Sequence, residues 1–452
     1  MSLVRFWVPR IHRALLAGVL LCFFLMLIGG YGTLLRTAEG SQNSQSWPEG
    51  KTYDLKGLRV TLSAPVLVGR SKTSFNFPKI VGLRNGDLIA QVEVTPENWE
   101  GEQNEVLWSS DGGLTWGGEA PCPIATSARV LLPSGDFALL PYRLYPRPEG
   151  MGGPYCLIPS GKREVRFVKD GITVTGWPRK PVTSKEQGEH GQASFVFDGQ
   201  TVTLKDGKYL VTLNGFLEQP GATSGAFAVW GLGVKTSVVA AESEDGLHWK
   251  IRSVIADEHW KLAGAEGPNE ASLCRLKDGR LLCVFRSYGW GLVYGQTWSS
   301  DEGKTWTEPV YSGYAWSVDP RLAVVKDGTV VLSGGRPGVL MWFSADGTGK
   351  EWQLIDLVDH HNAFHPEDPL ARYSSAPGGA LYANSGASTG YTEVATLDDS
   401  HVLCVYDRSP LSSETQMRGE MLAPGKTTGP ADVRDTWSVW AVRATLAKMG
   451  PR

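Results

Sequence analysis

The sequence has little net charge and almost no helical periodicity. Its 452 residues include 44 Lys and Arg against 47 Asp and Glu, which gives a net charge of −3. Nucleic-acid-binding proteins carry an excess of basic side chains, so this balance gives no indication of a nucleic-acid partner or of an acidic partner surface. The 54 Gly and 17 Trp are high counts that suit a turn-rich β protein with tryptophan-bearing repeats.

Long apolar runs are also missing, except near the N-terminus. Residues 14–35 form an uncharged, mostly apolar run that follows Arg5, Arg10 and Arg13. A basic start before an apolar run is typical of a secretory signal, and the run is also long enough for an uncleaved membrane anchor. Both interpretations of residues 1–40 stay open. Either predicts an extracytoplasmic protein, secreted or N-terminally anchored, that contacts a membrane only through this segment.

Cysteine is scarce, and no Cys/His spacing resembles a zinc site. Apart from Cys22 in the apolar run, the cysteines are Cys122, Cys156, Cys274, Cys283 and Cys404. Five is an odd number, so at least one thiol is free or intermolecular. Cys274 and Cys283 flank one predicted turn and form either a disulfide or two packed thiols, and Cys122 with Cys156 is another possible pair. We expect no cofactor and no metal.

Six similar hairpins follow one another along the chain. Each is an apolar strand, a polar turn and a second apolar strand, and the turns lie at Gly86, Gly135, Gly207, Gly279, Gly328 and Ser400. Successive turns are 49, 72, 72, 49 and 72 residues apart. Repetition of this kind indicates an array of supersecondary units. The pattern predicts an all-β fold over residues 59–452, a six-bladed β-propeller of four-stranded antiparallel blades, with residues 41–58 as a linker.

A second motif alternates with the hairpins. Ser109–Trp116 and Ser299–Trp306 both fit S-x-D-x-G-x-T-W, and Ser243–Trp249 and Ser344–Trp352 are looser variants. In such a stretch, Asp and Ser cap a tight turn, Gly supplies an unusual backbone angle and Trp packs beneath. We therefore expect these aspartates to stabilise turns and to have no catalytic role.

The starts of the inner strands are the expected place of a functional site. In a propeller, the innermost strand of each blade lines the central channel. Counting nine residues back from each turn gives Phe77, Thr126, Asp198, Glu270, Asp319 and Tyr391. This geometry predicts that three acids and a tyrosine lie around one axis.

With its Asp-boxes (BNR repeats), the chain resembles the sialidase (neuraminidase) superfamily from residue 60 onward. Members carry a Glu that opens a blade and an Arg 16 residues later, and Glu270 and Arg286 have this spacing. Arg336, eight residues before Ser344, matches another family arginine, and Tyr391 takes the place of the tyrosine nucleophile. The resemblance implies that Glu270 activates Tyr391 and that the two arginines bind an acidic sugar.

This assignment has a chemical rationale. An acidic sugar whose carboxylate lies on the attacked carbon repels an anionic nucleophile, whereas a neutral Tyr with Glu as base avoids this repulsion. Arginine binds a carboxylate with two parallel hydrogen bonds.

The sequence departs from the family pattern at two places. Asn76 occupies the position of the family's first arginine, and Lys79 or Arg321 are the candidates to replace it. The family's acid/base Asp is missing from the loop that follows. The candidates for the general acid are the glutamates of that stretch and two acids at inner-strand starts, with Glu100, Glu102 and Asp198 favoured. The full set is Glu93, Glu97, Glu100, Glu102, Glu105, Asp198 and Asp319.

Three histidines, His360, His361 and His365, form a further cluster. Such a cluster binds a metal or contacts the substrate, and we favour His361 as a substrate contact.

The leading hypothesis is an exo-glycosidase that removes a terminal, acidic sugar from a glycan, with retention, through a Tyr391 adduct. The alternatives are a non-catalytic propeller that binds glycans or proteins and a transglycosylase.

Overall fold

The structure is a computed structural model that describes the greater part of the chain after residue 45. The described residues are 46–83, 85–95, 103–182, 195–219, 235–261, 264, 266–287, 294–313, 318–335, 338–371, 373, 387–409 and 436–450. The chain divides into two compact units, Met1–Ser46 and Trp47–Arg452. The predicted signal or anchor lies outside the described residues. In the described part, no helix has the length and apolar character needed to cross a membrane.

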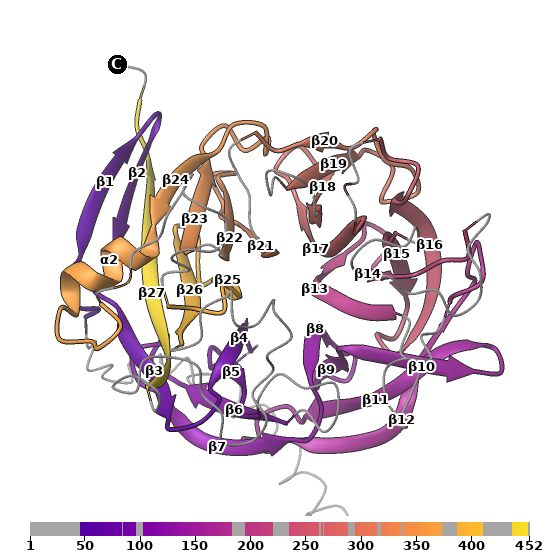
Figure 1. Ribbon diagram of the computed structural model, residues 1–452, viewed down its shortest axis with the longest axis horizontal. Coiled ribbons are helices and arrows are strands. Elements are labelled where there is room, and N and C mark those ends of the chain that lie inside the picture. The colour runs from indigo at the N-terminus through magenta and orange to yellow at the C-terminus, as the bar shows by residue number, and fades with distance from the viewer. Residues whose placement is uncertain are drawn as a thin grey trace, which may run out of the picture. The chain divides into compact units, whose positions relative to one another are not determined.

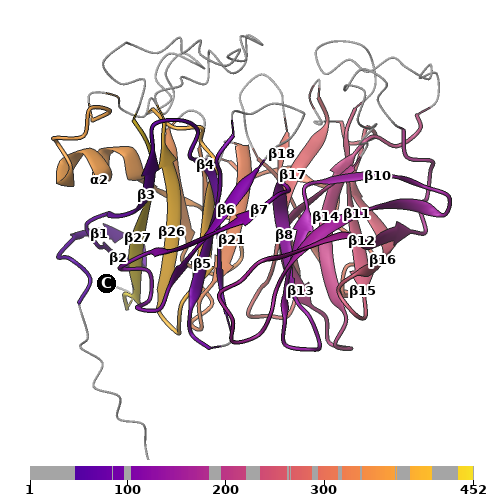
Figure 2. The same cartoon turned by 90° about the horizontal axis from the view of Figure 1, so that it is seen from below.

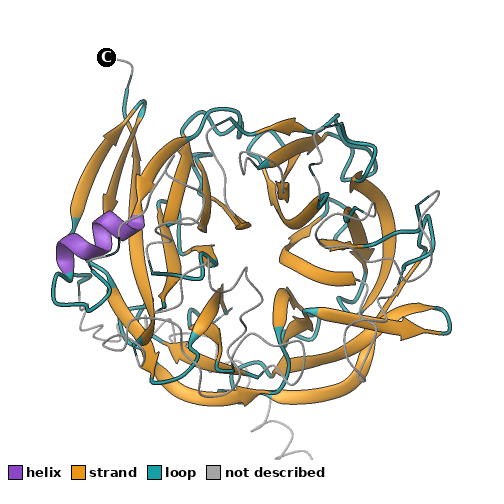
Figure 3. Cartoon of the chain, viewed as in Figure 1, coloured by secondary structure: helices purple, strands orange, loops and turns teal. Residues whose placement is uncertain are grey.

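Within Trp47–Arg452, the described residues are almost entirely β-strands, with one α-helix (Figure 3). The helix, α2 (Leu357–Phe364), begins after Asp356. The Asp356 side chain accepts hydrogen bonds from the backbone N–H groups of Val358 and Asp359, as an N-cap residue does. The predicted all-β class is therefore confirmed in this part of the chain.

Three sheets have four antiparallel strands each, in chain order. The first contains β4 (Asn76–Gly82), β5 (Leu88–Glu93), β6 (Asn104–Ser109) and β7 (Gly117–Cys122). The second contains β17 (Pro268–Arg275), β18 (Leu281–Ser287), β19 (Gly295–Ser299) and β20 (Val310–Tyr311). The third contains β21 (Val318–Val324), β22 (Val330–Gly335), β23 (Val339–Ser344) and β24 (Gln353–Asp356).

The fourth sheet has nine strands. They are β8 (Thr126–Leu131), β9 (Phe137–Pro141), β10 (Arg143–Arg147), β11 (Gly150–Ile158), β12 (Arg166–Thr175), β13 (Phe195–Thr203), β14 (Tyr209–Gly215), β15 (Ser237–Ser243) and β16 (His248–Ala256). Two hairpin groups, one beginning at β8 and one at β13, are joined by short parallel contacts of β12 with β16 and of β13 with β8. The pairings close a cycle through β8, β9, β11, β12, β16, β15, β14 and β13.

The fifth sheet brings the two ends of the unit together. It contains β1 (Lys51–Leu55), β2 (Leu58–Leu62), β3 (Val66–Ser71), β25 (Thr392–Thr396), β26 (His401–Arg408) and β27 (Trp437–Lys448). The last strand, β27, pairs with β26 and also with β2 and β3. Because β1 is paired in this sheet, the assignment of residues 41–58 to a linker is wrong for this stretch.

All six predicted hairpins are present as β4/β5, β8/β9, β13/β14, β17/β18, β21/β22 and β25/β26. In Figure 1, the first strands of these hairpins lie toward the centre of the ring of sheets. Figure 2 shows the same strands from the side, running along a common direction. The predicted turn glycines adopt positive φ angles, for example 88° at Gly86 and 90° at Gly279. Glycine suits these positions because it has no Cβ to clash in this conformation.

The predicted capping aspartates stabilise turns, as expected. Asp301 Oδ1 accepts hydrogen bonds from the backbone N–H groups of Lys304 (3.1 Å) and Thr305 (2.9 Å). The Ser299 hydroxyl donates to the same oxygen, and the Thr305 hydroxyl donates to Oδ2. Asp111 makes the equivalent bonds in the turn between β6 and β7.

The core consists of apolar side chains packed between neighbouring sheets, and the described cysteines are free and buried in it. Cys274 pairs in register with Leu282 and belongs to a different apolar cluster from Cys283, so a disulfide between these two cysteines is excluded. The Cys122 thiol donates to the Cys156 sulfur at 2.7 Å.

Replacement of Asp301 by Ala tests the role of the capping aspartates. Asp301→Ala removes four hydrogen bonds, so we expect the free energy of unfolding to fall by about 1–2 kcal/mol at pH 7. Although burial opposes it, hydrogen bonding lowers the pKa of Asp301 to about 2. The contribution is therefore complete above the unfolded pKa of about 3.9 and is lost as the pH falls through 2.

Urea unfolding at pH 7 and at pH 2.5 measures the difference. Glu351→Ala is the control, because Glu351 makes only an exposed ion pair with Lys56. An equal loss in both variants at pH 7 would contradict the capping role.

Candidate active site

Most of the inner strands have a shift in their pairing register, whereas β25 has none. The pairing register shifts between Asn269 and Ala271 in β17 and between Val318 and Arg321 in β21. Within these shifts, Glu270 and Asp319 have positive φ angles of 37° and 43°. An unpaired residue in a β-bulge turns its side chain away from the regular pleat. Similar register shifts occur in β4, β8 and β13.

The residues predicted by counting back from the turns meet at one pocket. The lining includes all six: Phe77, Thr126, Asp198, Glu270, Asp319 and Tyr391. The others that line it are Lys79, Glu93, Asn104, Ala125, Ser127, Tyr142 and Arg143. The bulges and the hairpin register together explain why side chains from six inner strands reach the same space.

Tyr391 and Glu270 form a direct pair in this pocket. The Tyr391 hydroxyl donates to Glu270 Oε1 at 2.6 Å. Lys79 Nζ lies 5.6 Å from the centre of the Tyr391 ring, and the Phe77 ring packs edge-on against Tyr391 with 4.7 Å between centroids. These contacts fix the phenol between an apolar ring and a carboxylate.

Arg286 holds Glu270 from the other side. Its Nη1 lies 2.9 Å from Glu270 Oε2, and its Nη2 lies 2.9 Å from both carboxylate oxygens of Glu266. The backbone N–H of Asp319 donates to Glu270 Oε2 as well, at 2.9 Å. The charges of Glu266 and Glu270 raise the pKa of the Arg286 guanidinium despite its burial. The sequence pattern predicted that Glu270, Arg286 and Tyr391 lie at one site, but it did not predict the contact with Glu266.

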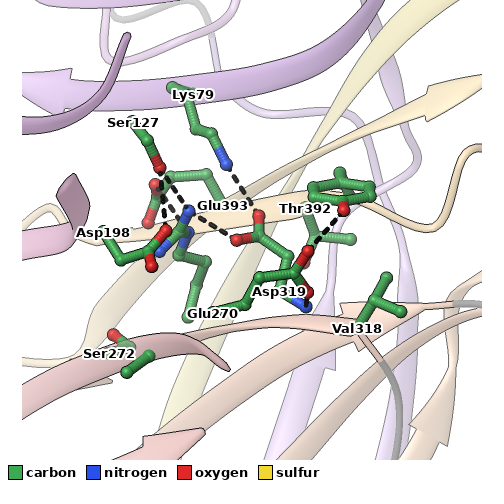
Figure 4. A network of polar contacts seen from close by, with 12 residues as sticks. Lys79, Ser127, Asp198, Glu270, Ser272, Val318, Asp319, Thr392 and Glu393 are labelled. Carbon is green, nitrogen blue, oxygen red and sulfur yellow. Dashed lines mark hydrogen bonds and ion pairs between the residues drawn. The ribbon is translucent and has the colours of Figure 1, made fainter. Parts of the chain in front are cut away.

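A network of buried ion pairs lies beside the pair (Figure 4). Arg321 Nη2 contacts Asp319 Oδ1 at 2.6 Å, and Arg321 Nε lies 3.4 Å from Glu393 Oε2. Arg129 Nη1 also donates to Glu393 Oε2, at 2.8 Å, and Lys79 Nζ donates to Asp319 Oδ2, at 2.7 Å. Burial lowers the pKa of Lys79 and so favours loss of its charge, while Asp319 opposes this effect.

Glu393 and Arg129 were not predicted, although the sequence contained a signal for Glu393. Lys79, Arg321 and Glu393 each lie two residues after a predicted strand start, at Phe77, Asp319 and Tyr391. Alternate residues of a strand point to the same face, so a charged residue at this spacing also faces the axis. Arg129 follows Thr126 by three residues and does not have this spacing, so the same count does not find it.

Asp198 is an acid that stays protonated near neutral pH. Burial raises its pKa to about 8, Arg321 and Lys79 oppose the shift, and Asp319 and Glu270 reinforce it. Its side chain is 1% exposed, and the Ser127 hydroxyl donates to Oδ1 at 3.4 Å. No hydrogen-bond partner is found for Oδ2. Asp198 lines the pocket and can therefore donate a proton to a group bound there.

Other predicted residues lie away from the pocket or outside the described part of the chain. Arg321 is 0% exposed and belongs to the ion-pair network, and Asn76 is buried opposite Glu93 in β4; neither lines the pocket. The predictions for Arg336, Glu100 and Glu102 concern residues that lie outside the described part of the chain.

The placement of His361 as a substrate contact at this pocket is wrong. His361 lies in α2, where Nδ1 bonds the Tyr406 hydroxyl (2.9 Å) and Nε2 bonds Asp368 (3.0 Å). His360 bonds Tyr53 and the backbone oxygen of Ser63 through its two ring nitrogens. Both rings are therefore committed to structural contacts beside the fifth sheet.

Comparison with known proteins shows similarity at the level of structure. No family model matches the chain, and no curated protein matches its sequence. A protein of unknown function from Dyadobacter fermentans is 18% identical, with a TM-score of 0.57 over 86% of this chain and 100% of that chain. An α-L-arabinofuranosidase mutant from Fusarium graminearum, solved with an iminosugar inhibitor, is 14% identical, with a TM-score of 0.50 over 84% and 98%.

A Hadza microbial sialidase is 15% identical, with a TM-score of 0.48 over 74% of this chain and 64% of that chain. At these identities, the similarity with TM-scores of 0.50 and above shows a shared fold.

The titration of Asp198 has a measurable effect on stability. Because its folded pKa (about 8) exceeds the unfolded value of about 3.9, the folded state binds the additional proton between these pH values. The free energy of unfolding then falls as the pH rises from 4 to 8. Asp198→Asn removes the titrating group, so we expect the stability of the variant relative to wild type to increase across this window.

Urea unfolding at pH 4.5, 6 and 8 measures this trend. Asp206→Asn makes the same substitution at an exposed hairpin turn and is the control. A constant difference between Asp198→Asn and wild type at all three values would contradict the assignment.

Proposed function

We propose that the chain is a retaining glycoside hydrolase built on a six-bladed β-propeller, and that the pocket at the inner-strand starts is its active site. The observation that carries this proposal is the 2.6 Å contact between the Tyr391 hydroxyl and Glu270 Oε1, in a pocket that also contains the protonated Asp198. A nucleophilic group and a proton donor that face one pocket are what retaining glycosidases require.

Six hairpins around one axis support the six-bladed interpretation. Three of them begin the four-stranded sheets, and β25/β26 begins the inner part of the fifth sheet. The remaining two, β8/β9 and β13/β14, begin the two groups that short parallel contacts merge into the nine-stranded sheet. On this interpretation, β3 and β27 close the ring by pairing an N-terminal with a C-terminal strand.

The proposed reaction has two steps. In the first, the nucleophile bonds to the anomeric carbon, the glycosidic C–O bond breaks, and Asp198 gives its proton to the leaving oxygen. In the second, water attacks the same carbon, Asp198 takes a proton from the water, and the nucleophile is released. Asp198 suits both steps because a pKa of about 8 lets it give and take a proton near neutral pH.

In the form implied by the family resemblance, Glu270 removes the phenol proton and the Tyr391 oxygen attacks. The substrate would be a terminal acidic sugar of a glycan, which fits the predicted location outside the cytosol. The arabinofuranosidase among the structural neighbours, by contrast, is named for a neutral sugar. The common proposal is therefore glycoside hydrolysis at the Tyr391–Glu270 pair, and the charge of the sugar is a separate question.

Glycosidase activity can be tested with the full-length chain and a panel of aryl glycosides. We expect Glu270→Gln to lower kcat/KM by about 10²–10⁴-fold on any aryl glycoside that the wild type cleaves, because the variant lacks the carboxylate that acts as nucleophile or base. Glu351→Gln, an exposed glutamate in the third sheet's outer turn, is the matched control and should keep full activity.

The alternatives have distinct outcomes. Glycan binding without turnover in wild type, unchanged by Tyr391→Phe, would identify a binding propeller. A transglycosylase would form a new glycoside when an acceptor sugar is added, in place of the free sugar.

Aryl leaving groups of different acidity test Asp198 separately. Asp198→Asn should lower the rate strongly for phenyl glycosides, whose leaving group needs a proton, and only weakly for dinitrophenyl glycosides, whose leaving group does not. Equal losses on both substrates would exclude Asp198 as the general acid and return that role to Glu100 or Glu102.

A further inference from the structure

The pocket is lined by more acids than bases. The four acidic side chains are Glu93, Asp198, Glu270 and Asp319, and the basic ones are Lys79 and Arg143. With Asp198 protonated, three carboxylates face two cations, and Lys79 forms an ion pair with Asp319. Among the described lining residues, carboxylates therefore outnumber cations, which does not favour a substrate carboxylate.

Two of the arginines considered for an acidic sugar, Arg286 and Arg321, are already engaged with protein carboxylates, and Arg336 lies outside the described residues. Arg286 Nη2 contacts Glu266 and Arg286 Nη1 contacts Glu270, each at 2.9 Å. Arg321 contacts Asp319, is fully buried and does not line the pocket. A substrate carboxylate at Arg286 would compete with Glu266 and Glu270 for the same guanidinium, and Arg321 is buried away from the pocket. Asn76 brings no charge in place of the third arginine.

The Glu270 carboxylate is better suited to attack an anomeric carbon than to remove the phenol proton of Tyr391. The carboxylate accepts hydrogen bonds from the Tyr391 hydroxyl (2.6 Å) and the Asp319 N–H (2.9 Å), and it forms an ion pair with Arg286 Nη1 (2.9 Å). Donors of this kind favour the charged form of a carboxylate. A carboxylate stabilised in this way is a poor base toward a phenol, which has an ordinary pKa of about 10. It remains an anion positioned at the pocket.

The remaining lining groups suit sugar hydroxyls. Ser127, Thr126 and Asn104 carry uncharged polar side chains at the pocket, beside the carboxylate of Glu93. Hydroxyl, amide and carboxylate groups can accept hydrogen bonds from the hydroxyls of a neutral sugar. A neutral sugar has no carboxylate on its anomeric carbon, so the repulsion that favours a tyrosine nucleophile is absent.

We propose that this site cleaves a neutral glycoside and that a carboxylate oxygen of Glu270, not the Tyr391 oxygen, bonds to the anomeric carbon. The proposal rests on the proposed glycosidase function. The glycosidic C–O bond breaks, its electron pair goes to the leaving oxygen, and Asp198 protonates that oxygen. Water then attacks the Glu270-bound sugar, loses a proton to Asp198 and frees the Glu270 carboxylate. Tyr391 and Arg286 act as positioning residues that orient this carboxylate.

A substrate panel tests the sugar class. The full-length chain is incubated with 4-nitrophenyl glycosides of neutral pentoses and hexoses and with a 4-nitrophenyl α-sialoside. We expect release from at least one neutral glycoside at a kcat/KM at least 100-fold above that for the sialoside. Preferential release from the sialoside would overturn the neutral-sugar proposal and leave the glycosidase function standing. Release from none, natural glycans included, would overturn the glycosidase function itself.

A covalent trap identifies the attacking residue. The 2-fluoro derivative of the cleaved glycoside, with a dinitrophenyl leaving group, is reacted with wild type, and the labelled peptide is sequenced by mass spectrometry. We expect the label on Glu270, in the segment Pro268–Arg275, and still on Glu270 in Tyr391→Phe. Label on Tyr391 would overturn the assignment of the nucleophile.

Azide rescue gives a second readout that a merely structural role would not produce. Removal of a carboxylate nucleophile leaves space in which azide can attack the anomeric carbon. We expect Glu270→Ala to form a glycosyl azide of inverted configuration, at a rate at least 10-fold above its rate in water, while Tyr391→Phe does not respond to azide. Glycosyl azide from Tyr391→Phe alone would again overturn the proposal. A folded Glu270→Gln, with unchanged circular dichroism and no trapped label, covers the case in which Glu270→Ala does not fold.

Discussion

The structure depends on pairing of buried charges where the inner strands meet. Arg321 is fully buried between Asp319 and Glu393, and Arg129 reaches the same glutamate from β8. Removal of one member of a buried pair typically costs about 3–5 kcal/mol, because the remaining charge is left without compensation. These contacts join β8, β21 and β25, and so fix the strand starts from which Asp319 and Tyr391 reach the pocket.

The pocket is formed by departures from regular strand geometry. Phe77, Glu270 and Asp319 adopt positive φ angles, which cost on the order of 1–3 kcal/mol each for residues other than glycine. The surrounding sheets and ion pairs hold these angles in place. In return, the backbone N–H of Asp319 points to the Glu270 carboxylate, so one strained residue positions the functional group of another.

Asp198 and Glu270 favour opposite protonation states because their surroundings differ. Asp198 has few stabilising donors and is deeply buried, so it keeps its proton up to a pKa of about 8. Glu270 receives donors from Arg286, Asp319 and Tyr391, which stabilise its charge. Two carboxyl groups whose environments favour opposite protonation states are the usual basis of acid and nucleophile roles in glycosidases. The same donors explain why Arg286 is a positioning residue in our proposal, although its spacing from Glu270 indicates a substrate clamp.

The repeat of hairpins and the residues at its axis can be predicted from local sequence patterns. The turn glycines required positive φ angles, the apolar flanks required paired strands, and nine residues back from each turn were the residues that line the pocket. These are local properties, or they follow from the fixed rise and alternation of a β-strand. The same counting places Tyr391 and Glu270 at one pocket.

The partners of the charged residues, by contrast, depend on how distant parts of the chain pack together. Glu266 engages Arg286, Arg321 is buried beneath the pocket, His361 bonds Tyr406 in the fifth sheet, and β1 joins that sheet where a linker was expected. Some of these contacts join segments that come together only when the sheets pack. Others depend on which of several nearby acids lies within reach of an arginine. Spacing along the chain carries no information on that choice, because it is made by distance and burial in the folded protein.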